Sequence, residues 1–151
     1  MIKKHKVVYT AGTFDLFNLG HVNLLKKSKN IAECLIVGVS TDELVFAYKK
    51  VYPIISYHDR VKILQSCKYI DKIVKQSVLM DIKLLKKYSV DCVTIGSDWK
   101  TKHLDGLDWM KQHRQVIYFP YTKGKSSTLI KRKIIQESYN IIKAEFRREL
   151  K

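Results

Sequence analysis

Short apolar runs alternate with amphipathic stretches along the first 120 residues of the chain. The apolar runs predict five strands, over residues 7–12, 34–40, 69–74, 91–95 and 115–119. The second run is apolar throughout, as is typical of a strand that helices cover on both faces. Between the runs, apolar residues at helical spacing predict helices over about 19–31, from Ser56 onward, over about 80–88 and up to about 113.

Strands that alternate with helices at this spacing predict a parallel sheet with right-handed crossovers. The expected fold class is α/β, a three-layer sandwich around a five-stranded parallel sheet. Ligands of such sheets bind beyond the carboxyl ends of the strands. Four stretches with candidate chemistry each follow a strand end: residues 12–21, 40–50, 96–99 and 120–128. Their convergence predicts one site at that edge of the sheet.

The first of these stretches joins the first strand to the first helix through Gly12 and Gly20. Gly12 permits a close approach of the backbone to a ligand, and Gly20 lets the turn bend without a Cβ clash. A turn at a helix N-terminus presents backbone N–H groups and the positive end of the helix to a phosphate. His21 follows at the mouth of the helix, where its ring can donate to a phosphate oxygen. The residues alone therefore predict a nucleotide or phosphate site.

Length and composition place the chain among single-domain globular proteins. It has 151 residues, of which 46% are hydrophobic and 11% aromatic, as expected of a chain that folds around one core. We expect a domain over residues 1–135, with residues 136–151 as an amphipathic helical extension of it. No apolar stretch approaches the length of a membrane span, and no signal-peptide pattern follows the N-terminal lysines. Three separated cysteines without metal-ligand spacing predict reduced thiols and a cytoplasmic location.

The formal net charge of +15 suits three kinds of anionic partner: nucleic acid, a membrane surface or small polyanionic substrates. Solvated lysines spread over the surface would give the same total. The basic residues are not confined to one block, and no nucleic-acid-binding motif accompanies them. We therefore expect no nucleic-acid partner, and the charge by itself supports only the attraction of polyanionic ligands.

A long amphipathic helix is predicted from Ser126 toward the C-terminus. A basic amphipathic helix can lie on a membrane, but more often it packs on its own domain or on a partner subunit. Its apolar stripe consists of Ile130, Ile134, Ile135, Ile141, Ile142, Phe146 and Leu150.

The stretch from Thr10 to His21 also resembles a family signature. It is similar to G-T-F-D-x-x-H-x-G-H of the cytidylyltransferase family, and nearest to the glycerol-3-phosphate cytidylyltransferases within it. Asn18 stands where the family has its first histidine. The resemblance covers about residues 7–135 and implies a Rossmann-like nucleotidyltransferase. The residues that match as they stand are Gly12, Thr13, Phe14, Asp15, Gly20 and His21.

The resemblance implies catalytic roles for His21 and for the residue at position 18. In the family, both signature histidines hold phosphate oxygens of the nucleotide while the α-phosphate passes through its five-coordinate transition state. Asn18 keeps a hydrogen-bond donor at the first of these positions but no positive charge. Three explanations stay open: an engineered substitution that traps a complex, natural divergence with slower turnover, or a paralogue that binds without turning over.

Further matches follow in the order of the family. The family's essential lysine corresponds to Lys49 or Lys50, with Lys50 preferred. Arg60 lies in a segment similar to the family's E-x-R helix, which implies a substrate-binding or structural role. Lys68-Tyr69-Ile70-Asp71 resembles the family's R-Y-V-D element. Because that element touches the subunit interface in the family, it implies a homodimer, with Lys68 near the nucleotide and Asp71 in a substrate-binding or structural role.

Two motifs at later strand ends complete the resemblance. Gly96-Ser97-Asp98-Trp99 resembles G-D-D-W, and an acid and an indole there could recognise a base or a polar substrate. Residues 121–128 resemble R-T-x-G-I-S-T-T, with Tyr121 for the family's arginine and Lys125 for its isoleucine. The nucleotide-binding residues implied at these two motifs are Asp98, Trp99, Thr122, Gly124, Ser127 and Thr128.

The resemblance also implies a reaction. A phosphorylated alcohol, glycerol 3-phosphate or a similar polyol phosphate, would attack the α-phosphate of CTP, and pyrophosphate would leave. Mg²⁺ would arrive on the triphosphate, because it prefers phosphate and water ligands, and no protein metal site is expected. The rival functions are adenylyl transfer, a catalytically weakened or silent CTP binder, and a nucleic-acid binder.

Overall fold

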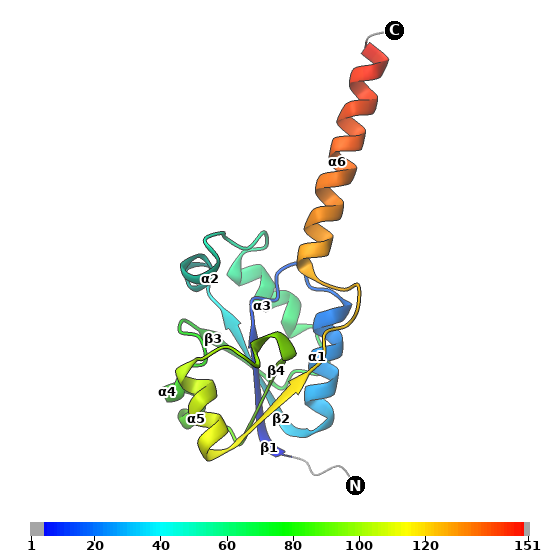
Figure 1. The fold of residues 1–151 in the computed structure, drawn as a ribbon. Coiled ribbons are helices and arrows are strands. Elements are labelled where there is room, and N and C mark those ends of the chain that lie inside the picture. Colours follow the sequence, from blue (N-terminus) through cyan, green and yellow to red (C-terminus); the bar gives the residue numbers. More distant parts are fainter. Residues whose placement is uncertain (1–4, 150–151) are drawn as a thin grey trace.

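Five parallel strands form one sheet in the order β3-β2-β1-β4-β5 (Figure 1). The computed structural model describes residues 5–149. The predicted α/β fold with a five-stranded parallel sheet is confirmed. The strands are β1 (His5–Gly12), β2 (Ala32–Ser40), β3 (Lys72–Gln76), β4 (Cys92–Gly96) and β5 (Gln115–Phe119). The helices are α1 (Leu19–Asn30), α2 (Asp42–Lys49), α3 (Tyr57–Gln65), α4 (Ile82–Lys87), the short 3-10 helix η1 (Ser97–Trp99), α5 (Asp105–His113) and α6 (Ser127–Glu149).

Helices cover both faces of the sheet and give each face its own core. Val8 of β1 belongs to the core that includes Leu25 of α1 and Leu64 of α3. Its neighbour Tyr9 belongs to the opposite core, which includes Leu85 of α4 and Leu107 of α5. Successive residues of a strand point to opposite faces, so the continuous apolar runs of the central strands serve both cores. This burial holds the carboxyl ends of β1, β4 and β5 at one edge of the sheet.

The helix starts have the caps expected from their sequence. The Thr41 hydroxyl accepts a hydrogen bond from the Leu44 N–H at 3.1 Å, and the Ser56 hydroxyl accepts one from the Asp59 N–H at 3.3 Å. Such caps satisfy N–H groups that the first turn of a helix leaves free. The predicted start of a helix at Ser56 is confirmed, and the segment after Ser40 forms the helix α2.

The third strand lies later in the chain than the sequence predicted. The apolar pair Tyr69 and Ile70 suggested a strand over 69–74, but β3 spans Lys72–Gln76. Both residues lie in the preceding turn and still pack against the core on the α1 side of the sheet. Asp71 ends this turn, where its carboxylate accepts from the Leu35 N–H and from Lys29 Nζ, each at 2.6 Å. The sequence pattern suggested a strand because Tyr69 and Ile70 pack against the core, although they lie in a turn.

The last helix, α6, leaves the globular part of the molecule and projects away from it (Figure 1). It is 23 residues long, and its side chains from Arg132 to Arg147 are exposed. The predicted apolar position Leu150 lies outside the described residues. No helix within residues 5–149 is both long enough and apolar enough to cross a membrane.

The Arg60 side chain ties together the chain segments at the site edge of the sheet. Its guanidinium is fully buried and forms an ion pair with Asp42 at 2.6 Å. It also donates to the backbone carbonyls of Ile55 at 3.0 Å, Ser40 at 2.9 Å and Thr13. These partners use the planar fork of donors that only arginine provides. Arg60 is thus structural in this fold, one of the two roles implied for it.

We expect Arg60→Met to lower the free energy of unfolding by about 3–5 kcal/mol, because the half-buried Asp42 carboxylate and three backbone carbonyls lose their donor. Urea unfolding monitored by circular dichroism would measure the loss. Lys62→Met is the matched control, since Lys62 is exposed on the same helix and should change stability by less than about 0.5 kcal/mol. Equal effects of the two substitutions would contradict the structural role of Arg60.

Candidate active site

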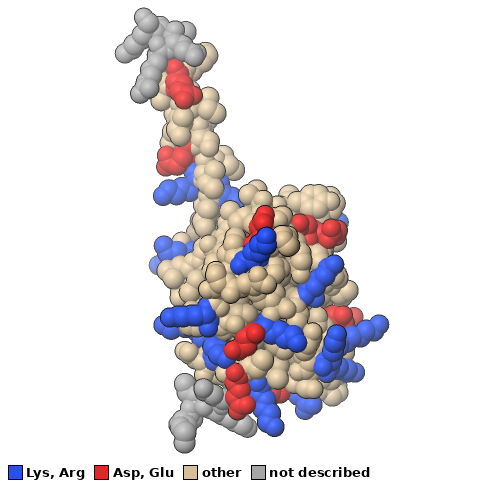
Figure 2. Space-filling model, turned by 180° about the vertical axis from the view of Figure 1, so that it is seen from behind, with Lys and Arg blue, Asp and Glu red and all other residues tan. Residues whose placement is uncertain are grey.

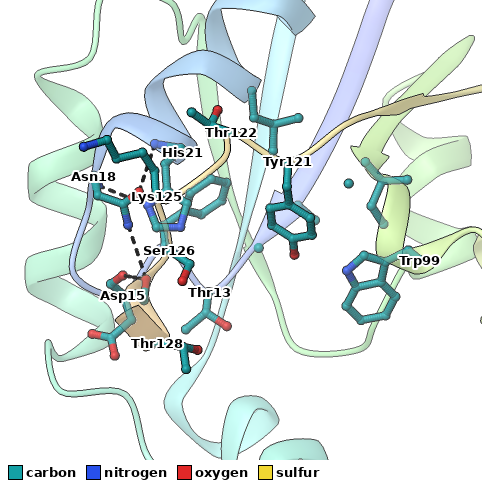
Figure 3. A pocket seen from close by; sticks show the side chains of 18 of the residues that line it. Thr13, Asp15, Asn18, His21, Trp99, Tyr121, Thr122, Lys125, Ser126 and Thr128 are labelled. Atoms are coloured by element: carbon teal, nitrogen blue, oxygen red, sulfur yellow. Dashed lines mark hydrogen bonds between the residues drawn. The ribbon is translucent and has the colours of Figure 1, made fainter. Parts of the chain in front are cut away.

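A cavity of about 470 Å³ opens at the carboxyl edge of the sheet. Its walls come from the turn after β1, the first turns of α1, the end of α2, η1 and the segment that joins β5 to α6 (Figure 3). The structure thus brings the predicted strand-end stretches together at one site. The predicted site residues that line the cavity are Gly12, Thr13, Phe14, Asp15, Asn18, Gly20, His21, Lys49, Trp99, Thr122, Ser127 and Thr128.

Two glycines are required here by close packing. A Cβ on Gly20 would lie 2.9 Å from the Lys125 carbonyl oxygen, so only glycine lets the start of α1 touch the loop before α6. A Cβ on Gly12 would lie 3.2 Å from the Phe14 ring. Phe14 and Leu16 themselves have φ of 55° and 48°, a left-handed conformation that is costly for non-glycine residues. The turn is therefore held in its shape by contacts from elsewhere in the fold.

His21 presents one defined ring nitrogen to the cavity. Its Nδ1 accepts a hydrogen bond from the Asn18 backbone N–H at 3.2 Å, so the ring proton of the neutral form lies on Nε2. The ring stacks on Phe17 with centroids 5.6 Å apart. Burial, opposed by the Asp15 charge and aided by the Lys49 charge, lowers the pKa of His21 to about 4. His21 is therefore a neutral, oriented donor at neutral pH.

The Asn18 side chain is already hydrogen-bonded within the protein. Its Oδ1 accepts from the Gly20 N–H at 2.9 Å and caps α1. Its Nδ2 donates to the Leu16 carbonyl at 3.0 Å and to the Ser127 hydroxyl at 3.5 Å. We expected this amide to be a donor to phosphate. To act in that way, it would have to give up one of these contacts.

Asp15 joins three segments of the cavity wall. Its carboxylate accepts from the backbone N–H groups of Ile54 at 3.0 Å and Ile55 at 2.9 Å, and pairs with Lys131 of α6 at 2.9 Å. Its carbonyl accepts from the Ser127 hydroxyl. Burial alone would raise the pKa of Asp15, but these hydrogen bonds and the Lys131 charge hold it below its ordinary value. The carboxylate therefore stays ionised, and its role is to hold the loop at Ile54 and Ile55 and the helix α6 together.

The cavity carries a surplus of positive charge. Four lysines line it: Lys27, Lys49, Lys125 and Lys131. Among the described residues that line it, Asp15 is the one acid, and Lys131 already pairs with it. The N-terminal ends of α1 and α6 also open onto this space, and helix N-termini favour anions. The arrangement suits a polyanionic ligand.

The other end of the cavity is aromatic. Trp99 and Tyr121 flank it (Figure 3), and Lys102 Nζ lies 4.2 Å from the Trp99 ring centroid on that ring's face. Burial, together with the nearby Asp98 carboxylate, raises the pKa of Tyr121 to about 12. The Tyr121 hydroxyl is therefore a neutral donor. Flat apolar walls with a few polar groups are typical of sites for a nucleobase.

Comparison with known proteins assigns this arrangement to a family. The cytidylyltransferase-like family model matches residues 9–133, which contain nearly all of the cavity wall. The chain belongs to the cytidylyltransferase-like family. It is therefore a nucleotidyltransferase, as the signature around His21 predicted.

Relatives with assigned names cover most of this nucleotidyltransferase. Glycerol-3-phosphate cytidylyltransferase of Bacillus spizizenii is 40% identical over 129 residues, which cover 84% of this chain and 95% of the relative. The enzyme of the same name from Staphylococcus aureus is 34% identical over 131 residues, with 85% and 95% covered. A probable ethanolamine-phosphate cytidylyltransferase of Encephalitozoon cuniculi is 35% identical over 112 residues, with 74% and 35% covered.

A solved structure supports the fold of this family member. The lipopolysaccharide core biosynthesis protein from Thermoplasma volcanium matches with a TM-score of 0.63 and 23% identity, covering 80% of this chain and 98% of that chain.

Several predicted site residues of this nucleotidyltransferase lie away from the cavity wall. Lys49 lines the cavity, whereas the preferred Lys50 follows α2 in a left-handed conformation and donates to the Ala47 carbonyl. Lys68 lies over the Tyr69 ring in the turn before β3. The predicted residues outside the wall are Lys50, Arg60, Lys68, Asp71, Asp98 and Gly124.

Other residues of the wall were not predicted from the sequence. Lys131 lies one helical turn beyond the Ser127-Thr128 motif, so helical spacing was a signal for it. Tyr48 shares a hydrogen bond of 3.0 Å with Thr13. Asn23 Nδ2 donates to the Thr122 hydroxyl at 3.0 Å. The last two contacts depend on tertiary structure, and nothing in the sequence marked them.

We expect stability to fall as the pH drops from 6.5 toward 4, because the unfolded chain then binds a proton that folded His21 excludes. The loss reaches at most about 3 kcal/mol. His21→Gln removes this titration, so its stability should fall less than that of the wild type over the same range. Urea unfolding at a series of pH values measures the difference. Parallel pH curves for the two proteins would show that His21 is not held neutral.

Proposed function

We propose that this protein transfers CMP from CTP to a small phosphorylated alcohol, glycerol 3-phosphate or a similar polyol phosphate. An oxygen of the acceptor phosphate attacks the α-phosphorus of CTP in line. A new P–O bond forms, the bond from the α-phosphorus to the bridging oxygen breaks, and pyrophosphate leaves with the electron pair. The convergence of His21, the start of α6 and four lysines in one cavity is the observation that carries the proposal.

The triphosphate is proposed to lie between the starts of α1 and α6. His21 Nε2–H, Lys49 and the hydroxyls of Ser126 and Thr128 line this region. Such donors stabilise the charge that develops on the equatorial oxygens without adding a covalent step. A neutral histidine contributes a directed hydrogen bond, and the lysines contribute the charge. We propose that the cytosine base lies toward Trp99 and Tyr121.

The charge of the cavity favours an acceptor that has no cationic group. Ethanolamine phosphate, which the name of one relative mentions, carries an ammonium that needs a carboxylate or an aromatic cage. Both Asp15 oxygens already accept hydrogen bonds within the protein. Glycerol 3-phosphate presents only hydroxyls and phosphate, which lysines and amide groups can hold. The names of two relatives mention the same substrate.

Magnesium is proposed to enter as part of the nucleotide substrate. Among the described residues, no group of three or more His, Cys, Asp or Glu side chains is placed to hold a metal ion. Asp15, the acid in the wall, is committed to Ile54, Ile55 and Lys131. Mg²⁺ on the triphosphate is satisfied by phosphate oxygens and water.

We expect pyrophosphate release with Mg·CTP and glycerol 3-phosphate, and a drop in kcat of about 100-fold or more in His21→Ala, because a transition-state donor is lost. A coupled pyrophosphate assay measures both. His58→Ala is the matched control, since His58 is exposed on α3 and should retain full activity.

Substrate exchange in the same assay separates the rival functions. Turnover with ATP in place of CTP would favour adenylyl transfer. Faster turnover with ethanolamine phosphate would contradict the acceptor argument. If CTP raised the melting temperature but no phosphorylated alcohol gave pyrophosphate, the protein would be one that binds CTP without turning it over.

We expect Asn18→His to raise kcat by up to about 100-fold, which corresponds to about 2.7 kcal/mol. Histidine Nδ1 can accept from the Gly20 N–H as Asn18 Oδ1 does, and its Nε2–H is then free for a phosphate oxygen. Asn18→Ala is the comparison, since it removes the cap without adding a donor. Equal activity of Asn18→His and the wild type would show that the protein compensates for Asn18 elsewhere.

A further inference from the structure

The outer part of α6 lies beyond the region that this chain shares with its family. The family model ends at residue 133, whereas α6 continues to Glu149. At the root of the helix, Ser127, Thr128 and Lys131 line the cavity. Beyond it, the side chains from Arg132 to Arg147 are exposed, and Figure 1 shows the helix extending away from the globular part. Residues 134–149 therefore take no part in the cavity wall.

This outer part carries an exposed apolar face. At 100° per residue, its large apolar side chains fall within about half of the helix circumference. They are 54–70% exposed, and Figure 2 shows uncharged side chains along the projecting helix, interrupted by acidic and basic ones. The residues that form this apolar face are Ile134, Ile135, Tyr139, Ile141, Ile142 and Phe146.

The area of the apolar face is larger than a monomeric protein usually exposes, and it is large enough for an interface between two subunits. Side chains of this size, exposed to this extent, offer roughly 700 Å² of apolar surface, whereas the largest patch of a typical monomer is about 300–600 Å². Two such faces packed together would bury roughly 1,400 Å², within the range of a stable protein–protein interface. The area therefore fits a second copy of the same helix.

The charges around the apolar face also fit a second copy. Glu137 lies at one border of the face and Lys143 at the other, when the helix is viewed along its axis. In a parallel pair of identical helices, the Glu137 border of each copy meets the Lys143 border of the other. Glu145 lies within the arc of the face, and a carboxylate there opposes insertion into acyl chains or binding to an anionic membrane.

We propose that residues 134–146 of α6 pair in parallel with the same segment of a second copy of this chain. The interface is separate from the cavity and from the turn around Lys68 and Asp71, where the family resemblance would place a dimer contact. The proposal does not depend on the substrates proposed above, and its test uses no activity measurement.

Sedimentation equilibrium of the full-length protein tests the pairing. We expect the wild type to have twice the mass of the double variant Ile135→Lys with Ile142→Lys at the same concentration, with a dissociation constant raised at least 10-fold in the variant. Gln136→Lys with Asn140→Lys adds the same charge on the opposite side of the helix, so it should keep the wild-type mass. Far-UV circular dichroism confirms that both variants remain folded.

The remaining outcomes overturn the proposal. A monomeric wild type would exclude the pairing. An unchanged mass of the isoleucine variant, together with no cross-link between chains in Ser138→Cys, would place the subunit contact elsewhere. If a monomeric wild type co-sedimented with phosphatidylglycerol vesicles and the isoleucine variant did not, the apolar face would bind lipid instead.

Cysteine cross-linking tests the orientation of the pair. Ser138→Cys, near the middle of the face, should form a disulfide between chains on mild oxidation. Gln136→Cys and the wild type, with its own three cysteines, should not. Equal cross-linking in all three proteins would contradict a parallel pair.

Discussion

The buried guanidinium of Arg60 is the interaction on which the site depends. Parallel strands end in carbonyls and loops that have no partner in the sheet, and burying them is costly unless a donor is supplied. Arg60 supplies donors to the carbonyls of Thr13, Ser40 and Ile55 at once. The turn after β1, the start of α2 and the loop before α3 therefore hold fixed positions, and the cavity is formed before any ligand arrives.

Asp15 fixes the opposite wall by the same principle with the charges reversed. Its carboxylate gathers Ile54, Ile55 and Lys131, so the root of α6 becomes part of the site. The buried charges of Arg60 and Asp15 are thus both paired within the protein. What remains toward the ligand is a set of lysines and helix N-termini, whose fields add at one place. A cavity assembled in this way discriminates by charge first and by shape second.

The sequence predicted five strands, their parallel direction and the turn with His21, because apolar periodicity and glycine-containing turns are local signals. It misplaced β3, because Tyr69 and Ile70 are buried from a turn. It left the choice between two neighbouring lysines open, with Lys50 preferred. In the structure Lys49 lines the cavity, while Lys50 donates to the Ala47 carbonyl. Contacts such as Tyr48 with Thr13 depend on how separate elements dock, and no local pattern records that.

The capping box at α1 explains how a substitution at position 18 is compatible with an intact site. The Asn18 backbone N–H, which any residue but proline would offer, orients the His21 ring. The Asn18 side chain satisfies the Gly20 N–H, a task that asparagine and a histidine Nδ1 can both perform. Asparagine therefore preserves the turn, the cap and the His21 tautomer, but its remaining donors point to Leu16 and Ser127. Within the proposed function, Asn18 therefore keeps the structural role of this position and weakens only the role proposed for it toward phosphate.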